Sequence, residues 1–371
     1  MVNFMLHRFQ RHCEVINMSR KLTRREFIKG AAVAGIGIYG AALLPVDLMA
    51  AGKTSNPKSR VAIVSADNVL VAADTNPNPL SKTSMTSIGE SGHAIDQRIL
   101  NSMIGDAMTE LTKTKSVAAA WKSLFKPSDI VGIKVNCIAR RGMSTHPEVI
   151  AAIIAGLKLA GVKEENIIVW DRRNDEMIAA GYKINQDGPG VKCHGTNGDH
   201  DPTSFTQGSV SGKLSRILSE KITALINVPI MKDHGGAGIT SALKNHYGSF
   251  DNPGPYHGNN CDPFVAELNC LPAIKNKTRL VICDALKGLA NGGPGHNPQF
   301  VWDAKTILAA TDPVALDYQV WQIIEARRKE TGLSTLAAAG REPKHIASAA
   351  SMGLGTNDPA KMEVVRKTVA G

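Results

Sequence analysis

Short runs of apolar and β-branched residues alternate along this chain with longer amphipathic stretches. The short runs predict strands over residues 60–66, 130–135, 167–170, 224–231, 279–283 and 306–310. Elsewhere apolar residues recur at helical spacing, which predicts helices over residues 95–111, 147–161, 214–222, 264–274, 313–328 and 359–368. Strands that alternate with helices are typical of a parallel sheet with crossover connections. The expected fold is therefore α/β, with a mostly parallel, doubly wound sheet.

Four segments between these elements are rich in Gly, Asn, Pro or Ser, at residues 67–92, 185–212, 250–261 and 289–300. Loops of this length in a compact domain are usually functional or mobile. We expect the Gly/Asn/Pro-rich loops to lie over the C-terminal edge of the sheet, where the last of them is a candidate lid.

Each predicted strand ends in polar residues. They are Asp67, Lys134 with Asn136, Asp171, Lys232 with Asp233 and His234, Asp284, and Asp312. Ligands of open α/β sheets bind in the crevice beyond the carboxyl ends of the strands. We therefore expect these side chains to line one crevice at one edge of the sheet. The alternative is that Asp simply marks turns and helix caps where the chain returns to solvent.

The segment before the second predicted helix contains Thr145, His146 and Pro147. Proline is favoured at the first position of a helix, and the free N–H groups of a helix start favour anions. Thr145 and His146 are therefore candidates for ligand binding, with plain helix capping as the alternative.

Residues 227–245 read as a strand, a glycine-rich loop and a helix. Glycines such as Gly236 and Gly238 allow backbone N–H groups to turn toward a ligand. Thr240 and Lys244 are four residues apart and would share a helix face. No Lys follows the glycines directly, so this is not a Walker A loop. The segment predicts an anionic ligand, with a merely tight strand-to-helix turn as the alternative.

A metal is the other option for this crevice. Six potential ligands lie close in sequence but lack the spacing of a zinc motif: His234, His246, Asp251, His257, Cys261 and Asp262. The chain also lacks a nucleophile elbow, an H-E-x-x-H motif and a dinucleotide fingerprint. These absences disfavour a serine hydrolase, a zincin and an ordinary NAD enzyme.

We therefore predict a protein that binds an anionic small ligand, a metal or another cofactor. The candidate acid–base residues, or metal ligands if a metal is bound, are His234, Asp171 and Asp284. The candidate binding residues are Lys134, Asn136, Thr145, His146, Lys232, Gly236, Gly238, Thr240, Lys244 and Asn245. The alternative is a non-catalytic ligand-binding protein or an accessory protein of a redox enzyme.

Composition narrows the possible partners. The formal net charge is +10, but no dense Lys/Arg run with interleaved aromatic residues occurs, so we expect no nucleic-acid partner. The chain has six cysteines and no C-x-x-C motif, which argues against an iron–sulfur cluster and a disulfide framework. A divalent metal and a single Cys261–Cys270 disulfide stay open.

The segment from Thr23 to Lys29 contains two adjacent arginines and precedes a long uncharged run. This pattern predicts a twin-arginine signal peptide over residues 1–51, with Met18 as an alternative start. The apolar run is short for a transmembrane helix of about 20 residues, although an uncleaved anchor is the alternative. We expect one α/β domain over residues 52–371, located in the periplasm after transport by the twin-arginine translocase, with no stable membrane anchor after cleavage.

Several short motifs together resemble the "domain of unknown function 362" family. They are Gly132–Asn136, Ser144–Pro147, Ile168–Asp171, Asn227–His234, Thr240–Asn245 and Thr311–Asp317. The resemblance covers most of residues 60–355, and it implies no established reaction. Many relatives carry ferredoxin-type cysteine motifs, which this chain lacks, so it implies no cluster here. Other relatives carry twin-arginine leaders, as we expect of this chain.

Overall fold

The computed structural model describes residues 58–72 and 93–369. The predicted signal peptide, residues 1–51, and most of the predicted loop at 67–92 lie outside the described residues. Within the described ranges, no helix combines the length and apolar character that crossing a membrane requires. The five cysteines from Cys137 to Cys283 are all free, so the Cys261–Cys270 disulfide does not form.

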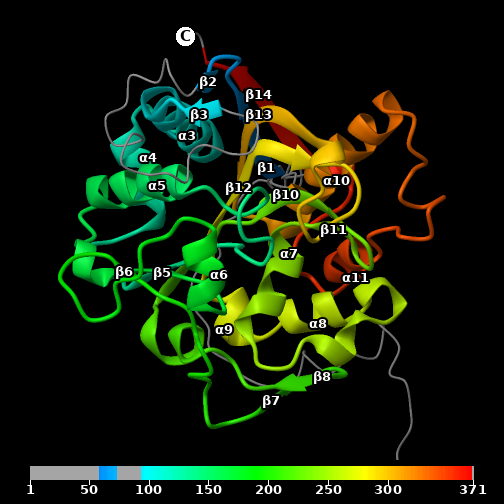
Figure 1. Cartoon of the computed structure of the whole chain (residues 1–371). Coiled ribbons are helices and arrows are strands. Elements are labelled where there is room, and N and C mark those ends of the chain that lie inside the picture. Colours follow the sequence, from blue (N-terminus) through cyan, green and yellow to red (C-terminus); the bar gives the residue numbers. More distant parts are fainter. Residues whose placement is uncertain (1–57, 73–92, 370–371) are drawn as a thin grey trace, which may run out of the picture. The chain divides into compact units, whose positions relative to one another are not determined.

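A ten-stranded sheet forms the centre of the fold (Figure 1), in the order β14-β1-β13-β12-β9-β4-β5-β6, with β10 beside β12 and β11 beside β10. Its strands are β1 (Ser59–Ser65), β4 (Val131–Lys134), β5 (Ile167–Trp170), β6 (Lys192–Cys193), β9 (Ala224–Asn227), β10 (Ile230–His234), β11 (Gly238–Thr240), β12 (Thr278–Leu289), β13 (Val301–Ala310) and β14 (Met362–Thr368). Only β11 and β13 run against the others. The mostly parallel sheet is therefore confirmed. Two small antiparallel pairs lie apart from it: β2 (Leu70–Ala72) with β3 (His93–Ile95), and β7 (Phe205–Gln207) with β8 (Val210–Gly212).

Helices cover both faces of the sheet, as a doubly wound fold requires. One face carries α3 (Gln97–Thr112), α4 (Val117–Leu124) and α5 (Pro147–Leu159), which pack against one another (Figure 1). The other carries α7 (Ala242–Asn245), α8 (Phe264–Asn269), α9 (Pro272–Lys275), α10 (Pro313–Glu330) and α11 (His345–Ser351). The short α6 (Asn174–Ala179) follows β5. Each face buries its own apolar cluster against the sheet.

Most predicted elements are present, and four differ for physical reasons. The strand at 224–231 is two strands, because Val228 and Pro229 interrupt it. Pro272 divides the helix at 264–274 into α8 and α9. The helix at 214–222 is a single wide turn, Ile217–Lys221. The helix at 359–368 is wrong, because this segment forms edge strand β14 beside β1.

Candidate functional site

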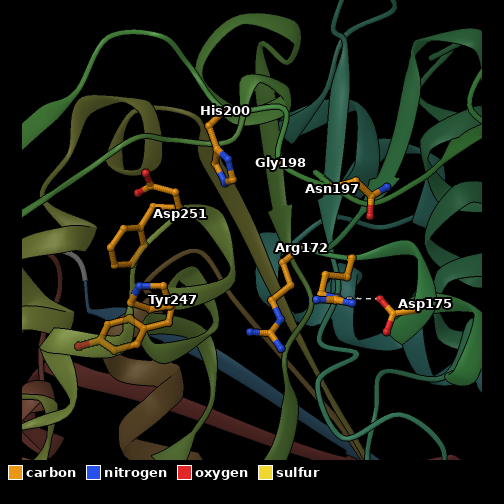
Figure 2. A pocket seen from close by; sticks show the side chains of 10 residues that line it. Arg172, Asp175, Asn197, Gly198, His200, Tyr247 and Asp251 are labelled. Carbon is orange, nitrogen blue, oxygen red and sulfur yellow. Dashed lines mark hydrogen bonds and ion pairs between the residues drawn. The ribbon is translucent and has the colours of Figure 1, made fainter.

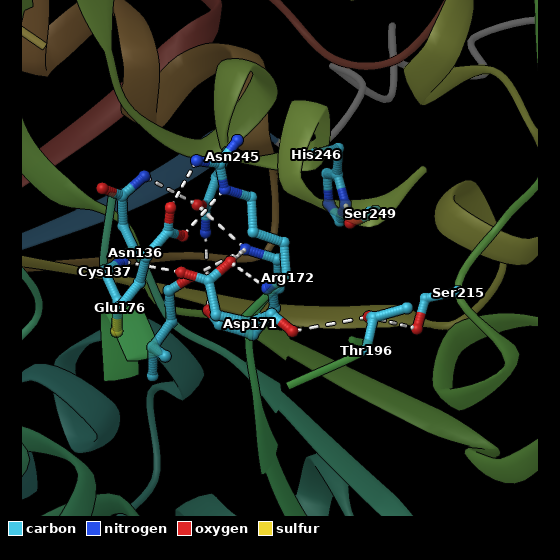
Figure 3. A network of polar contacts seen from close by, with 12 residues as sticks. Asn136, Cys137, Asp171, Arg172, Glu176, Thr196, Ser215, Asn245, His246 and Ser249 are labelled. Atoms are coloured by element: carbon cyan, nitrogen blue, oxygen red, sulfur yellow. Dashed lines mark hydrogen bonds and ion pairs between the residues drawn. The ribbon is translucent and has the colours of Figure 1, made fainter. Parts of the chain in front are cut away.

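The carboxyl ends of β4 and β5 bring Lys134 and Asp171 into direct contact. Lys134 ends β4, Asp171 follows β5, and the two strands are parallel neighbours. The Lys134 Nζ atom lies 2.7 Å from Asp171 Oδ1, and the two side chains are 1% and 5% exposed. The carboxylate also accepts hydrogen bonds from the backbone N–H groups of Cys137 (2.6 Å) and Arg172 (2.8 Å). Asp171 is thus the buried counter-ion of Lys134, within the network shown in Figure 3.

Two asparagines connect this ion pair to Lys232. The Asn245 Oδ1 atom accepts hydrogen bonds from Asn136 Nδ2 (3.0 Å) and Lys134 Nζ (3.4 Å). The Asn136 Oδ1 atom accepts one from Lys232 Nζ (2.9 Å), which also donates to the carbonyl oxygen of Met143 (3.1 Å). Lys232 forms no ion pair with any described carboxylate, and burial lowers the pKa of its ammonium group to about 7. Side chains from β4, β10 and α7 therefore meet at one edge of the sheet.

A cavity of about 120 Å³ opens beside this network. Seven of the predicted site residues line it: Lys134, Asn136, Asp171, His234, Thr240, Lys244 and Asn245. The remaining lining residues are Ile138, Arg172, Tyr247, Gly248, Pro253, His257 and Pro294. Pro294 belongs to the predicted lid, which is held to the β10–β11 turn by a hydrogen bond from Gly235 N to Gly293 O (3.0 Å). The cavity thus combines strand ends with three loops that are distant in sequence.

Lys244 is the cation of this cavity that lacks a counter-ion. Its side chain is 6% exposed, and no described carboxylate lies within 4 Å of its Nζ atom. Its contacts are the Nε2 atom of His257 at 3.3 Å and the face of the Tyr247 ring, 3.5 Å from the ring centroid. Burial lowers the pKa of the Lys244 ammonium group to about 8. An uncompensated cation in a cavity attracts an anion.

Thr240 lines the same cavity and carries an unsatisfied hydroxyl group. Its side chain is 3% exposed, and its Oγ1 atom has no hydrogen-bond partner. Buried polar groups without partners are uncommon, because each costs free energy until a ligand or water satisfies it. The hydroxyl of Thr240 is therefore a candidate ligand contact.

His234 is held as a neutral hydrogen-bond donor. Its Nδ1 atom accepts hydrogen bonds from the backbone N–H groups of Gly236 and Ala237, both at 3.0 Å. The proton of the neutral ring therefore lies on Nε2. Burial first, and the nearby Lys244 charge second, lower the pKa of His234 to about 2. With Nδ1 occupied and Nε2 protonated, the ring can donate a hydrogen bond but has no free lone pair for a proton or a metal.

The glycine-rich segment forms a hairpin turn and not a ligand cradle. The N–H group of Gly236 donates to His234 Nδ1 and not into the cavity. Gly238 lies in β11 opposite His234, with a φ angle of +80° and with the carbonyl oxygen of Arg341 against the position of a Cβ atom. A close approach of two backbones therefore explains this glycine.

Thr145, His146, Lys232 and Asp284 also do not line the cavity. The Thr145 hydroxyl is fully used, since it accepts a hydrogen bond from Asn136 N (3.0 Å) and donates one to the carbonyl oxygen of Val228 (2.8 Å). These four residues hold the edge of the sheet together and stand apart from the cavity surface.

His146 and Asp284 form a separate pair. The His146 Nδ1 atom lies 2.7 Å from Asp284 Oδ2, which also accepts the His146 backbone N–H group at 2.8 Å. Burial alone would lower the pKa of His146, but the adjacent carboxylate outweighs it and raises the pKa. A buried carboxylate of this kind fixes the tautomer and orientation of an imidazole.

The position of Asp312 shows that the six predicted strand ends do not all share one edge of the sheet. Because β13 is antiparallel to its neighbours, its last residue, Ala310, pairs with Val61 near the start of β1. Asp312 therefore lies at the opposite edge, where it caps α10 by accepting hydrogen bonds from Val314 N and Ala315 N. The capping alternative holds for this residue.

A second, wider cavity of about 410 Å³ adjoins the first and shares Arg172, Tyr247 and Pro253 with it. Figure 2 shows Tyr247 and Asp251 on one side of it and Asn197 and Asp175 on the other, with Arg172 between them. The Arg172 guanidinium group forms an ion pair with Glu176. Among residues 58–72 and 93–369, no three His, Cys, Asp or Glu side chains are placed to hold a metal ion. The predicted ligand group between His234 and Asp262 therefore does not assemble.

Among the lining residues that sequence reasoning did not predict as ligand contacts, three have polar side chains. Arg172 directly follows the predicted Asp171, so its position after a strand could have indicated it. Tyr247 and His257 lie in two short 3₁₀ turns after α7. These segments have no periodic pattern of apolar residues that would predict which way their side chains face. His257 was considered only as a metal ligand, whereas its Nε2 atom faces Lys244.

Comparisons with known proteins identify the family of the chain. A crystal structure of a Thermotoga maritima protein from the Northeast Structural Genomics Consortium is 12% identical, with a TM-score of 0.35, and the match covers 58% of each chain. No curated protein matches the sequence. A sequence model of the family described as "Domain of unknown function (DUF362)" matches residues 131–322, a range that includes every residue lining the 120 Å³ cavity. The chain belongs to the DUF362 family.

Proposed function

We propose that this protein binds a small anionic ligand in the 120 Å³ cavity, with Lys244 as its main contact. The proposal rests on one observation, namely the ammonium group of Lys244 that faces the cavity without a carboxylate partner. Burying an unpaired charge is costly, whereas a bound anion would compensate it. The small volume favours a compact head group such as a carboxylate or a phosphate.

The other polar groups of the cavity suit the same ligand. Thr240 offers a hydroxyl group without a partner, and neutral His234 offers an Nε2–H donor. Lys134 is neutralised by Asp171, but Lys232 has no carboxylate partner in the described part of the chain. The cavity and its surroundings therefore carry a positive excess that attracts anions.

The acid–base roles predicted for Asp171, His234 and Asp284 are not part of this proposal. Asp171 is committed to Lys134, the Nδ1 atom of His234 is occupied, and Asp284 is committed to His146. If the protein is an enzyme, Lys244 and His257 are the better pair for proton exchange, since Nζ and Nε2 are 3.3 Å apart. A carrier that only binds the anion is the alternative.

Replacing Lys244 with methionine is expected to weaken phosphate or oxalate binding about 10- to 100-fold, because charge-assisted hydrogen bonds contribute about 1.5–3 kcal/mol. Isothermal titration calorimetry measures this change. The melting temperature should not fall, because the substitution removes a buried charge without a partner. Lys122→Met, at an exposed position of α4, changes the net charge equally and should bind the anions as well as the wild type.

The pH dependence gives a second test of the same contact. The free ammonium group has a pKa of about 8, and a bound anion favours its charged form. Affinity should therefore decrease as the pH rises above 8, and Lys244→Met should remove this dependence. Equal affinity of wild type and Lys244→Met at pH 7 would disprove the proposed contact.

We also propose that the segment from Thr23 to Lys29 directs export through the twin-arginine pathway to the periplasm, which the arginine pair and the following uncharged run support. Replacing both Arg24 and Arg25 with lysine should retain the precursor in the cytoplasm, as measured by cell fractionation. The single change Arg20→Lys, outside the segment and present with either start, is the matched control and should leave export intact. Export of the double variant at the wild-type level would contradict the proposal.

A further inference from the structure

We propose that Lys244 acts as a nucleophile that forms an imine with a small carbonyl compound bound in the same cavity. The inference rests on the proposed function, because the carbonyl compound would carry the anionic group that the cavity binds. A 2-oxo acid has this combination of a carbonyl group beside a carboxylate.

Lys244 differs from Lys134 and Lys232, the two buried lysines of the neighbouring polar network. The Nζ atom of Lys134 donates to Asp171 and to the carbonyl oxygen of Val135, both at 2.7 Å. The Nζ atom of Lys232 donates to Asn136 and Met143, and its side chain does not line the cavity. Lys244 lines the cavity, and its Nζ atom contacts a ring face and an imidazole nitrogen. Its amine is thus the one of the three that a ligand can reach without breaking an ion pair.

An imine forms only from the neutral amine, and burial provides it. The Tyr247 ring favours the ammonium form, but loss of solvent outweighs the ring and lowers the pKa of Lys244 to about 8. At pH 7 the Lys244 amine is then neutral in roughly a tenth of the molecules, compared with less than about a thousandth for a lysine of ordinary pKa. Desolvated lysines of this kind serve as nucleophiles toward carbonyl groups.

His257 is oriented to take the proton of the ammonium group. Its Nδ1–H group points to the backbone carbonyl oxygens of Pro253 (2.9 Å) and Gly254 (3.2 Å). The lone pair of Nε2 therefore faces Lys244 Nζ, 3.3 Å away. Burial, followed by the charge of Lys244, lowers the pKa of His257, which keeps its imidazole neutral and able to accept.

The step balances without an external oxidant or reductant. The lone pair of Nζ attacks the carbonyl carbon, and the π electrons of the C=O bond move to the oxygen. His257 carries a proton from nitrogen to that oxygen, which gives a carbinolamine. His257 then transfers the remaining proton of the nitrogen to the hydroxyl group, the C–O bond breaks as water leaves, and the nitrogen lone pair forms the C=N bond. The hydroxyl group of Thr240, which has no partner in the ligand-free cavity, is suited to hold the carbonyl oxygen during this step.

Reductive trapping tests the inference. The full chain is incubated with pyruvate, and separately with glyoxylate, in the presence of sodium cyanoborohydride at pH 7, and the adducts are mapped by peptide mass spectrometry. Lys244 should be labelled at least about tenfold faster than exposed Lys122, because its neutral fraction is roughly a hundredfold larger. His257→Gln should slow the labelling of Lys244. Labelling of Lys244 no faster than that of Lys122 with both compounds would overturn the inference.

Lys244→Arg separates this inference from the proposed function. Arginine keeps the positive charge but is not a nucleophile, so the variant should still bind phosphate while no adduct forms at position 244. Wild-type protein that binds phosphate without being trapped would overturn the imine and leave anion binding intact. Loss of phosphate binding in Lys244→Met, measured on protein whose thermal unfolding is unchanged, supports the anion site independently of trapping.

Discussion

Replacing Lys134 with methionine lowers the free energy of unfolding by about 3–5 kcal/mol, because it leaves the carboxylate of Asp171 buried without its counter-ion. The two side chains are 1% and 5% exposed, and the Nζ and Oδ1 atoms are 2.7 Å apart. Asp171 cannot turn to solvent, because the N–H groups of Cys137 and Arg172 hold it in place. Urea denaturation monitored by circular dichroism measures the loss.

A double variant tests whether the missing partner is the cause. Lys134→Met combined with Asp171→Asn removes both charges, so it should recover part of the stability that Lys134→Met loses. The exposed pair Lys158–Glu164, with side chains 55% and 43% exposed, is the matched control. Lys158→Met should cost less than about 1 kcal/mol. A loss at Lys134 as small as that at Lys158 would show that the buried pair does not support the fold.

The sequence predicts the central parallel strands well, because β4 and β5 are short, largely apolar runs that are buried along their whole length. The strand at 167–170 is found with its predicted bounds, and both residues 131–134 and 167–170 are buried throughout. Such runs carry a signal that does not depend on the rest of the chain. The direction of β13 cannot be predicted in this way, because an apolar run looks the same in either orientation. Only its pairing with β12 and β1 decides it.

The wrong helix at 359–368 has a related cause. Edge strand β14 buries only Met362 fully, while Glu363 and Arg366 lie on a segment that is otherwise half-buried or exposed. A strand with so little burial lacks a clear alternation of apolar and polar residues. Its pairing with β1, more than 290 residues earlier in the chain, supplies the stabilisation that the local sequence does not indicate.

The same holds for the candidate site: residues that end a predictable strand can be found from the sequence, whereas contacts between distant segments cannot. Lys134 and Asp171 were predicted because each ends a recognisable strand, and the sheet topology brings them together. The glycines around Gly236 do not indicate which structure they form, because glycine permits a hairpin turn as readily as an anion cradle. The importance of His257 depends on a contact with Lys244 across thirteen residues of irregular chain. A sequence pattern contains no information on such a contact.

Acidification from pH 6.5 to 4.5 is expected to destabilise the fold by about 4–5 kcal/mol. Burial lowers the pKa most strongly for three histidines, to about 2 for His234 and about 3 for His246 and His345. Below pH 6.5 the unfolded chain therefore binds protons that the native state excludes, so stability falls as the pH falls. Each histidine contributes about 2 kcal/mol over this interval. Burial raises the pKa of Asp317 to about 7, so this carboxyl group acts in the opposite direction. Its effect offsets the contribution of about one histidine.

His345 provides the sharpest test of this pH dependence. Both of its ring nitrogens are buried without a hydrogen-bond partner, so His345→Leu removes a titrating group and breaks no hydrogen bond. Urea titrations at several pH values should show a slope that is lower by about 1.4 kcal/mol per pH unit between pH 6 and 4. His257→Gln, at an exposed ring, should change the slope less. An unchanged slope in His345→Leu would mean that this imidazole is protonated in the native state, and an acceptor for its proton would then have to lie against α11.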